Sequence, residues 1–179
     1  MIKYQKRWLI SGIIFTLVDG TLLHYVFEWS GNSPIAGLFS AVNESTWEHL
    51  KLIFWPMLLF GIIEYLAFEK RETNFIPSRV ISIIVGMAAI IIIFYTYTGI
   101  IGEHYLVADI ATFIISVIIA YMVGWKLINS NLVFTKKSQA LSILLLIVLI
   151  AFFIIFTNNP PQLDLFLDQS TGTWHQIIR

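Results

Sequence analysis

The sequence predicts an all-α protein, a bundle of five transmembrane helices in a lipid bilayer. Hydrophobic residues make up 58% of its 179 residues and charged residues only 12%, whereas ordinary globular proteins carry about 25% charged residues. The apolar residues gather in runs of about 20, the length that a helix needs to cross a bilayer. The basic residues cluster in alternate segments between these runs, as the positive-inside rule describes.

The five apolar runs define the predicted helices in order. The first follows Lys3, Lys6 and Arg7, like a signal peptide, but it is too long and lacks a small-residue cleavage site, so we expect it to remain as a span. No linker of domain size separates the runs, so we expect a single membrane domain over residues 1–179. The spans cover 8–27, 46–68, 80–100, 106–127 and 140–156, and an extracytoplasmic tail covers 157–179.

The distribution of charge predicts the orientation. With five spans, most basic residues fall on one side of the membrane, and only Lys51 and Arg179 fall on the other. The side richer in lysine and arginine is normally cytoplasmic. We therefore expect a plasma (cytoplasmic) membrane protein with its N-terminus inside and its C-terminus outside. The inner basic residues are Lys3, Lys6, Arg7, Lys70, Arg71, Arg79, Lys126, Lys136 and Lys137.

Composition excludes several classes of function. Eleven basic residues balance eleven acidic ones, so the chain has no basic excess of the kind that nucleic-acid binding needs. It contains no cysteine, which excludes disulfides, thiolate zinc sites, iron–sulfur clusters and thiol nucleophiles. Any chemistry must therefore come from the few other polar residues.

Small residues predict which helix faces meet, because helices in lipid associate by close packing of such residues. The first and fourth spans each carry a small or polar residue at every fourth position, and we expect these faces inside the bundle. The fifth span has almost none beyond Ser142, so we expect it to be peripheral. Pro56 removes the usual partner of the Leu52 carbonyl, which predicts a bend in the second span. The two rows are Gly12, Thr16, Gly20 and His24, and Ala108, Thr112, Ser116, Ala120 and Gly124.

The predicted outer end holds most of the acidic residues and all four histidines. Part of this pattern is typical of helix capping. Ser45, followed three residues later by Glu48, forms a capping box, and Glu44 favours the positive end of the helix dipole. Capping explains neither His49 nor Lys51, so a second role for this segment stays open.

Asp19 lies about 16 Å along the first span from Trp8, near the bilayer centre. A carboxylate at that depth costs about 2.5–3.5 kcal/mol on insertion scales, so it should face protein or water. No lysine or arginine lies at its depth in any span. Asp19 is therefore expected to be protonated, hydrogen-bonded to a hydroxyl group, or exposed to a water-filled cavity.

The histidines suggest a zinc site. His24, His49 and His104 come from three segments expected at one depth, and imidazole nitrogens suit zinc. A catalytic zinc keeps one position for water, and Glu48 or Asp109 would then act as the general base. No two histidines have the spacing of a helical HExxH motif, so structural histidines near the interface are the alternative. The further polar residues expected at this cavity are Asp19, Glu44 and Asp168.

Two segments resemble motifs of a known family. They are Val42-Asn-Glu-Ser-Thr-Trp-Glu-His-Leu-Lys51 and Asp168-Gln-Ser-Thr-Gly-Thr-Trp174, and the length and layout of the spans are also similar. The family comprises small multi-pass prokaryotic membrane proteins and is catalogued as a domain of unknown function. The resemblance implies the fold and a membrane location but no reaction. Because the family's ending more often reads Thr-Gly-Thr-Tyr-Gly, the resemblance assigns no role to His175.

Three functions are compatible with these residues. The first is a metal-dependent hydrolase that acts on a lipid or peptide at the outer leaflet. The second is capture or transport of a cation or small solute, with Asp19 as a deeper binding point. Five spans are few for a transporter and no inverted repeat is visible, so this function would need a homodimer or a partner protein. The third is a membrane scaffold whose outer acids and histidines serve only as caps.

Overall fold

The computed structural model describes residues 6–67 and 74–174, and all regular structure within them is helical. Five helices are long and apolar enough to cross a membrane, which confirms the predicted five-span, all-α fold. They are α1 (Lys6–Trp29), α3 (Thr46–Ala67), α4 (Phe75–Ile101), α5 (Leu106–Ile128) and α6 (Lys136–Asn158). Two short elements, α2 (Pro34–Gly37) and the 3₁₀-helix η1 (Asp164–Phe166), lie in the connecting segments.

All the long helices except α3 extend beyond the predicted apolar runs because polar residues also belong to the helices. The largest difference is at α4, which begins at Phe75 instead of residue 80. Pro77 stands in its first turn, where a helix needs no N–H donor. At the start of α6, the Oγ1 atom of Thr135 accepts a hydrogen bond from the N–H of Ser138 at 3.2 Å. These local features extend a helix where hydropathy alone does not.

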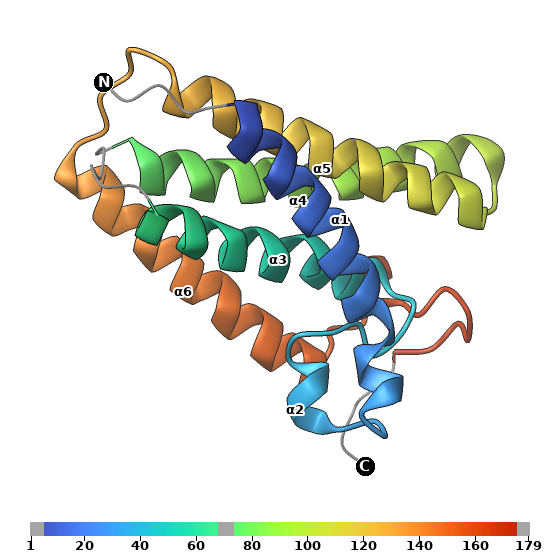
Figure 1. The fold of residues 1–179 in the computed structure, drawn as a ribbon. Coiled ribbons are helices and arrows are strands. Elements are labelled where there is room, and N and C mark those ends of the chain that lie inside the picture. Colours follow the sequence, from blue (N-terminus) through green and yellow to red (C-terminus); the bar gives the residue numbers. More distant parts are fainter. Residues whose placement is uncertain (1–5, 68–73, 175–179) are drawn as a thin grey trace.

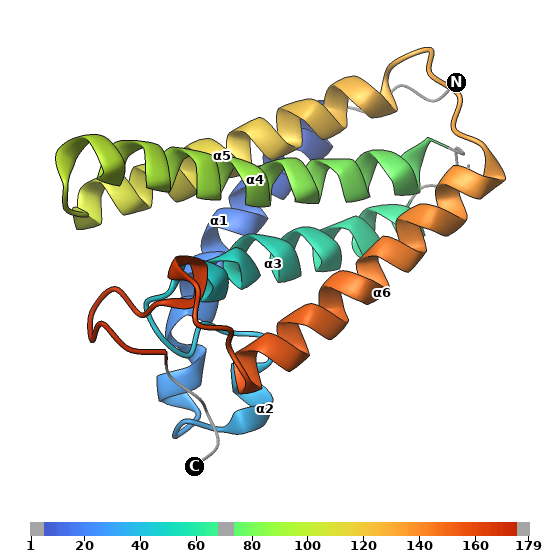
Figure 2. The ribbon, with the colours of Figure 1, turned by 180° about the vertical axis from the view of Figure 1, so that it is seen from behind.

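The long helices run antiparallel to one another along the chain. Helices α4 and α5 form a closely packed hairpin, and α1 crosses the bundle in contact with α3 and α5 (Figure 1). Helix α6 lies along the outside (Figure 2), and its buried residues are only Ser142, Phe153 and Thr157. The fifth span is therefore peripheral, as predicted from its lack of small residues.

The small-residue rows lie at the centre of the bundle, as predicted. In α1 the buried residues are Gly12, Thr16 and Gly20. In α5 the buried positions include Thr112, Ser116, Ala120 and Gly124. The hydroxyl groups of Thr16 and Tyr121 lie 2.9 Å apart and join the two helices by a buried hydrogen bond.

Gly20 marks a close approach of α1 to the backbone of α3. A Cβ atom at Gly20 would lie 2.5 Å from the carbonyl oxygen of Leu52 and 2.7 Å from the ring of Phe113. The Leu52 carbonyl is the group that Pro56, inside α3, leaves without its helical N–H partner. The missing side chain of Gly20 therefore lets the two backbones meet where α3 has a free acceptor.

Replacing Gly20 with alanine is expected to destabilise the protein by about 1–3 kcal/mol, because overpacking against a backbone atom cannot be relieved by a rotamer change. The measurement is the midpoint of thermal unfolding in detergent. Gly99→Ala is the matched control, since Gly99 also lies in a helix but an added Cβ would have no neighbour within 4 Å. That control should be neutral or slightly stabilising. Equal midpoints for the two variants would contradict the close approach.

A buried polar network ties α2, α3 and α6 together. Lys51, which is 0% exposed, forms an ion pair with Glu48. Its Nζ atom also donates hydrogen bonds to the carbonyl of Gly37 at 2.7 Å and to Oγ1 of Thr157 at 3.0 Å. The Thr157 hydroxyl in turn donates to Oε1 of Glu48 at 3.0 Å. The network fixes the first turn of α3 and the segment before it, which carry His49 and Glu44 of the candidate site.

A second buried ion pair joins α3 to α4. Nη2 of Arg79 lies 2.6 Å from Oε1 of Glu64, which is 0% exposed. The guanidinium carbon also lies 5.3 Å from the ring centroid of Tyr121, within the range of a cation–π contact.

The C-terminal segment turns back onto the bundle. The alternation of Leu163, Leu165 and Leu167 with Asp164 and Phe166 predicts a strand or a short interfacial segment. The structure has the 3₁₀-helix η1, whose Phe166 ring centroid lies 4.9 Å from that of Trp47. Gly172 predicts a turn with unusual backbone angles, and its positive φ of 67° confirms it. His175, with the predicted inner residues Lys3, Lys70 and Arg71, lies outside the described residues.

Candidate metal centre and its cavity

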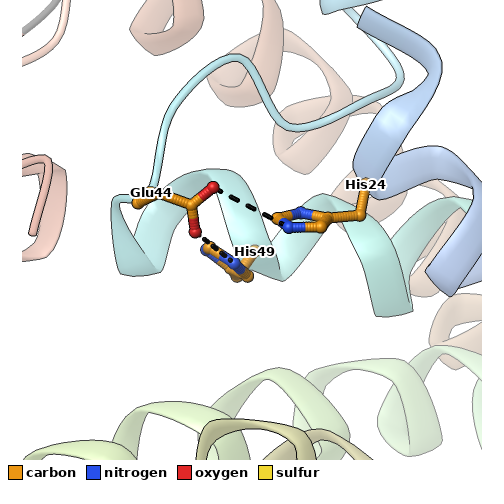
Figure 3. A group of neighbouring side chains, drawn as sticks. All are labelled: His24, Glu44 and His49. Atoms are coloured by element: carbon orange, nitrogen blue, oxygen red, sulfur yellow. Dashed lines mark ion pairs between the residues drawn. The ribbon is translucent and has the colours of Figure 1, made fainter. Parts of the chain in front are cut away.

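Three side chains from separate segments converge at one end of the bundle. His24 comes from α1, Glu44 from the segment before α3, and His49 from the first turn of α3 (Figure 3). One carboxylate oxygen of Glu44 lies 3.7 Å from Nε2 of His24, and the other lies 3.4 Å from Nε2 of His49. One potential ligand atom of each residue lies within 4.8 Å of the others.

The start of α3 explains how Glu44 and His49 are held. Ser45 Oγ accepts a hydrogen bond from the N–H of Glu48 at 3.3 Å, so the predicted N-cap is present. The second bond of a capping box, from the N–H of Ser45 to the carboxylate of Glu48, is replaced by two other bonds. Oδ1 of Asn43 accepts from the N–H of Ser45 at 3.0 Å, and the Glu48 carboxylate accepts from the N–H of Val42 at 3.1 Å. Glu44 therefore lies between two capping residues.

The hydrogen bond of His49 defines its tautomer. Its Nδ1 atom lies 2.8 Å from the carbonyl oxygen of Ser45. A carbonyl oxygen can only accept, so Nδ1 carries the proton, and in the neutral ring Nε2 keeps its lone pair. A histidine that binds a metal is usually oriented in this way by a bond from its other nitrogen. The lone pair of His49 is therefore directed to the side on which Glu44 lies.

His24 has unused ring nitrogens. Its Nδ1 atom is buried and has no hydrogen-bond partner within the described residues. Its Nε2 atom, 3.7 Å from Glu44, is too far for a hydrogen bond. Buried polar groups in proteins are almost always hydrogen-bonded, and an exception calls for an explanation such as a bound ion. The imidazole of His24 is therefore available to an external ligand.

The donor set fits a zinc-class ion. Two imidazoles and one carboxylate form a known set of three protein ligands that leaves a fourth position for water. Tetrahedral ligands at about 2.0–2.1 Å from zinc lie about 3.3 Å from one another. The three donor atoms, which lie within 4.8 Å of one another, would have to draw closer to hold the ion. When the His49 ring carries a proton on both nitrogens, Nε2 donates a hydrogen bond to Glu44, which lowers the pKa of that carboxyl below its usual value against the opposing effect of burial. The ring must release this Nε2 proton before the nitrogen can bind a metal. The carboxylate of Glu44 is therefore ionised at neutral pH.

The cluster opens onto a cavity of about 290 Å³ between the helices. His24, Glu44 and His49 contribute to its polar rim, together with His104 and Asp109. The deeper wall is largely apolar and comes from α3, α4 and α5. Its apolar residues include Leu52, Ile90, Phe94, Ile110 and Phe113.

The expected three-histidine set is only partly assembled. His24 and His49 lie together, but His104 is outside this close group and Glu44 takes its place. The Nδ1 atom of His104 lies 3.1 Å from Oδ2 of Asp109, and the hydroxyl of Tyr97 donates to Oδ1 of Asp109. The rim of the cavity thus carries a second polar group, made of His104, Asp109 and Tyr97.

The remaining predicted residues lie away from the cavity lining. The carboxylate of Glu48 is used by Lys51, Thr157 and Val42. Asp168 accepts bonds from the hydroxyl and the N–H of Ser170. These bonds lower the pKa of Asp168 although burial acts in the opposite direction. Asp19 is half-buried on α1 and has no hydrogen bond or ion pair in the described parts of the chain.

Sequence reasoning included Glu44 in the cavity but not among the ligands, and it missed Tyr97. Glu44 and His49 are five residues apart, which is no helical metal motif, and they meet because the capping turn precedes α3. Tyr97 lies one turn before the end of α4, where an interfacial tyrosine is ordinary. Neither residue carries a distinctive signal in the sequence.

The profile of a family described as "Family of unknown function (DUF6512)" matches residues 1–176. Comparison with curated proteins and with solved structures finds no match for the chain.

Proposed function

The chain belongs to this family of unknown function, and we propose that it is a zinc-dependent hydrolase. Its five long apolar helices make it a multi-pass membrane protein. The proposed ligands are His24, Glu44 and His49, and the substrate is an ester or amide that reaches them from the cavity. The observation that carries the proposal is the convergence of two imidazoles and a carboxylate whose donor atoms lie within 4.8 Å.

The chemistry follows from the donor set and from the second group at the rim. Zinc held by His24, Glu44 and His49 would supply a water that ionises near neutral pH and a Lewis acid that polarises a carbonyl. Asp109, held by Tyr97 and His104, lines the same cavity and would accept the proton of a water, directly or through His104. The water oxygen would form a bond to the carbonyl carbon, the bond from that carbon to the leaving oxygen or nitrogen would break, and the proton would pass to that leaving atom.

The distribution of charge supports a site on the extracytoplasmic side of the plasma membrane. In the described residues, basic side chains other than Lys51 belong to the ends of α1, α4, α5 and α6 that lie away from the cluster. The positive-inside rule assigns that end to the cytoplasm. These basic residues are Lys6, Arg7, Arg79, Lys126, Lys136 and Lys137.

Hydrolysis is favoured over passage of a cation or solute because of Asp19. A path through the membrane would make use of this carboxylate near the bilayer centre. Asp19 is not among the residues that line the cavity. A scaffold role would leave the unused nitrogens of His24 without an explanation.

Protein purified without chelators and incubated with zinc is expected to hold about one ion per chain, measured by elemental analysis after gel filtration. Glu44→Gln and His49→Gln should lose most of this zinc, because each removes one of three ligands. His104→Gln is the matched control and should keep it, since His104 lies outside the close group. Hydrolysis of p-nitrophenyl octanoate should require both zinc and Glu44.

The competing explanation is a purely structural His–Glu–His contact. It predicts folded protein that holds no zinc after incubation, or equal zinc contents in all three variants. Either result would overturn the proposal, provided that thermal unfolding shows the variants to be folded.

A further inference from the structure

We infer that the cavity receives one acyl chain of a membrane lipid, with the lipid head group beside His24, Glu44 and His49. The inference names the substrate class of the proposed hydrolase and rests on that function for its reaction. The binding itself requires only the cavity, so it can be tested without the metal.

The first argument is depth. Phe94 and Ile90, which line the cavity, lie seven and eleven residues before the end of α4 at Ile101. At 1.5 Å per residue these positions are about 10 and 16 Å from the helix end. The hydrocarbon core of a bilayer is about 30 Å thick. The cavity thus leads from the polar cluster to about the middle of the membrane, the depth that one leaflet's acyl chains occupy.

The second argument is the chemistry and size of the cavity. Its deeper wall is formed by the side chains of Leu52, Ile90, Phe94 and Phe113, which suit a hydrocarbon chain. A peptide is usually bound through its backbone groups or by a groove that fits a helix, and this wall offers few polar groups for a backbone. The volume of about 290 Å³ is at the lower limit for small-molecule sites, so it suits one chain better than two.

The third argument is access from the lipid. Ile110 and Leu106 on α5 and Tyr25 on α1 line the cavity, yet they are 51%, 74% and 45% exposed. At this end α1 diverges from the α4–α5 hairpin in both views (Figure 1, Figure 2). Side chains that are both lining and exposed mark the place where the cavity opens sideways. A chain can therefore enter from the bilayer without crossing a polar surface.

The test uses the full protein in nanodiscs that contain a phosphatidylcholine with a photoreactive diazirine near the end of one acyl chain. After illumination, mass spectrometry should find adducts on the α4 and α5 walls, at Ile90, Phe94 and Phe113. Ile110→Trp, which narrows the opening, should lose most of this labelling. Ile114→Trp is the matched control: Ile114 is one turn further along α5, is 38% exposed and does not line the cavity.

Adducts spread along lipid-facing residues such as those of α6, with equal yields in both tryptophan variants, would overturn the inference. The same experiment on chelator-treated protein and on Glu44→Gln separates it from the proposed function. Labelling of the cavity wall that persists in the chelator-treated protein and in Glu44→Gln supports binding of an acyl chain even where zinc binding fails. Zinc binding without wall labelling would leave the metal centre standing and remove the lipid as its substrate.

Discussion

Replacing Lys51 with methionine is expected to lower the free energy of unfolding by about 3–5 kcal/mol, because it leaves the buried carboxylate of Glu48 without its counter-charge. Lys51 is 0% exposed and Glu48 is 2% exposed, so water cannot replace the ammonium group. The substitution also removes the hydrogen-bond donor to Gly37 and Thr157. The measurement is thermal or denaturant unfolding in detergent.

The double variant Glu48→Gln/Lys51→Met is the control for this effect. A neutral amide at position 48 can accept the bond from the N–H of Val42 through its oxygen and donate through its NH2 group to the hydroxyl of Thr157, and no buried charge remains. Removing both charges of a buried pair is often close to neutral, so the double variant should recover most of the lost stability. A single Lys51 variant as stable as the double variant would show that the ion pair contributes little.

Arg79→Met is expected to destabilise the opposite end of the bundle by a similar amount, about 3–5 kcal/mol. It takes the guanidinium away from the fully buried carboxylate of Glu64 and from the ring of Tyr121. Since Tyr121 is bonded to Thr16, the effect should extend to the packing of α1. The same unfolding measurement applies, with tryptophan fluorescence reporting on tertiary packing.

Arg79→Lys separates charge from shape at this position. A lysine keeps the positive charge but cannot stack a planar group on the tyrosine or bond through a guanidinium fork. Its loss of stability should therefore fall between the wild type and Arg79→Met. The double variant Glu64→Gln/Arg79→Met should be more stable than Arg79→Met alone. Equal losses for the lysine and methionine variants would mean that geometry, and not charge, holds the helices here.

Most of the fold could be predicted because bilayer thickness is imposed from outside the protein. Apolar runs long enough to cross the bilayer identify the spans directly, and small residues at every fourth position identify the helix faces that pack together. Helix α2 could not be predicted this way, since its four residues are too few to give a hydropathy or periodicity signal. The 3₁₀-helix η1 was missed for a related reason, because alternating leucines also fit an extended segment.

The candidate site was predictable in composition and depth but not in its contacts. Which histidine meets Glu44 depends on how α1 is rotated against α3, and that rotation follows from the approach of Gly20 to the Leu52 carbonyl. For Glu48, the sequence predicts either capping of its own helix or a role as general base. The structure combines an N-cap at Ser45 with the ion pair, a choice set by the neighbouring α2 and α6 and not by local sequence.

The pairing of Lys51 with Glu48 also bears on how the chain enters the membrane. In the proposed orientation, Lys51 is the one basic residue among the described positions that must be translocated to the outer side during insertion. Its partner is three residues earlier in the same helix, so the two charges can neutralise each other as soon as the first turns of α3 form. The orientation in the membrane is then set by the basic residues on the cytoplasmic side. Glu48 can thereby lower the cost of translocating Lys51 in addition to its role in the finished fold.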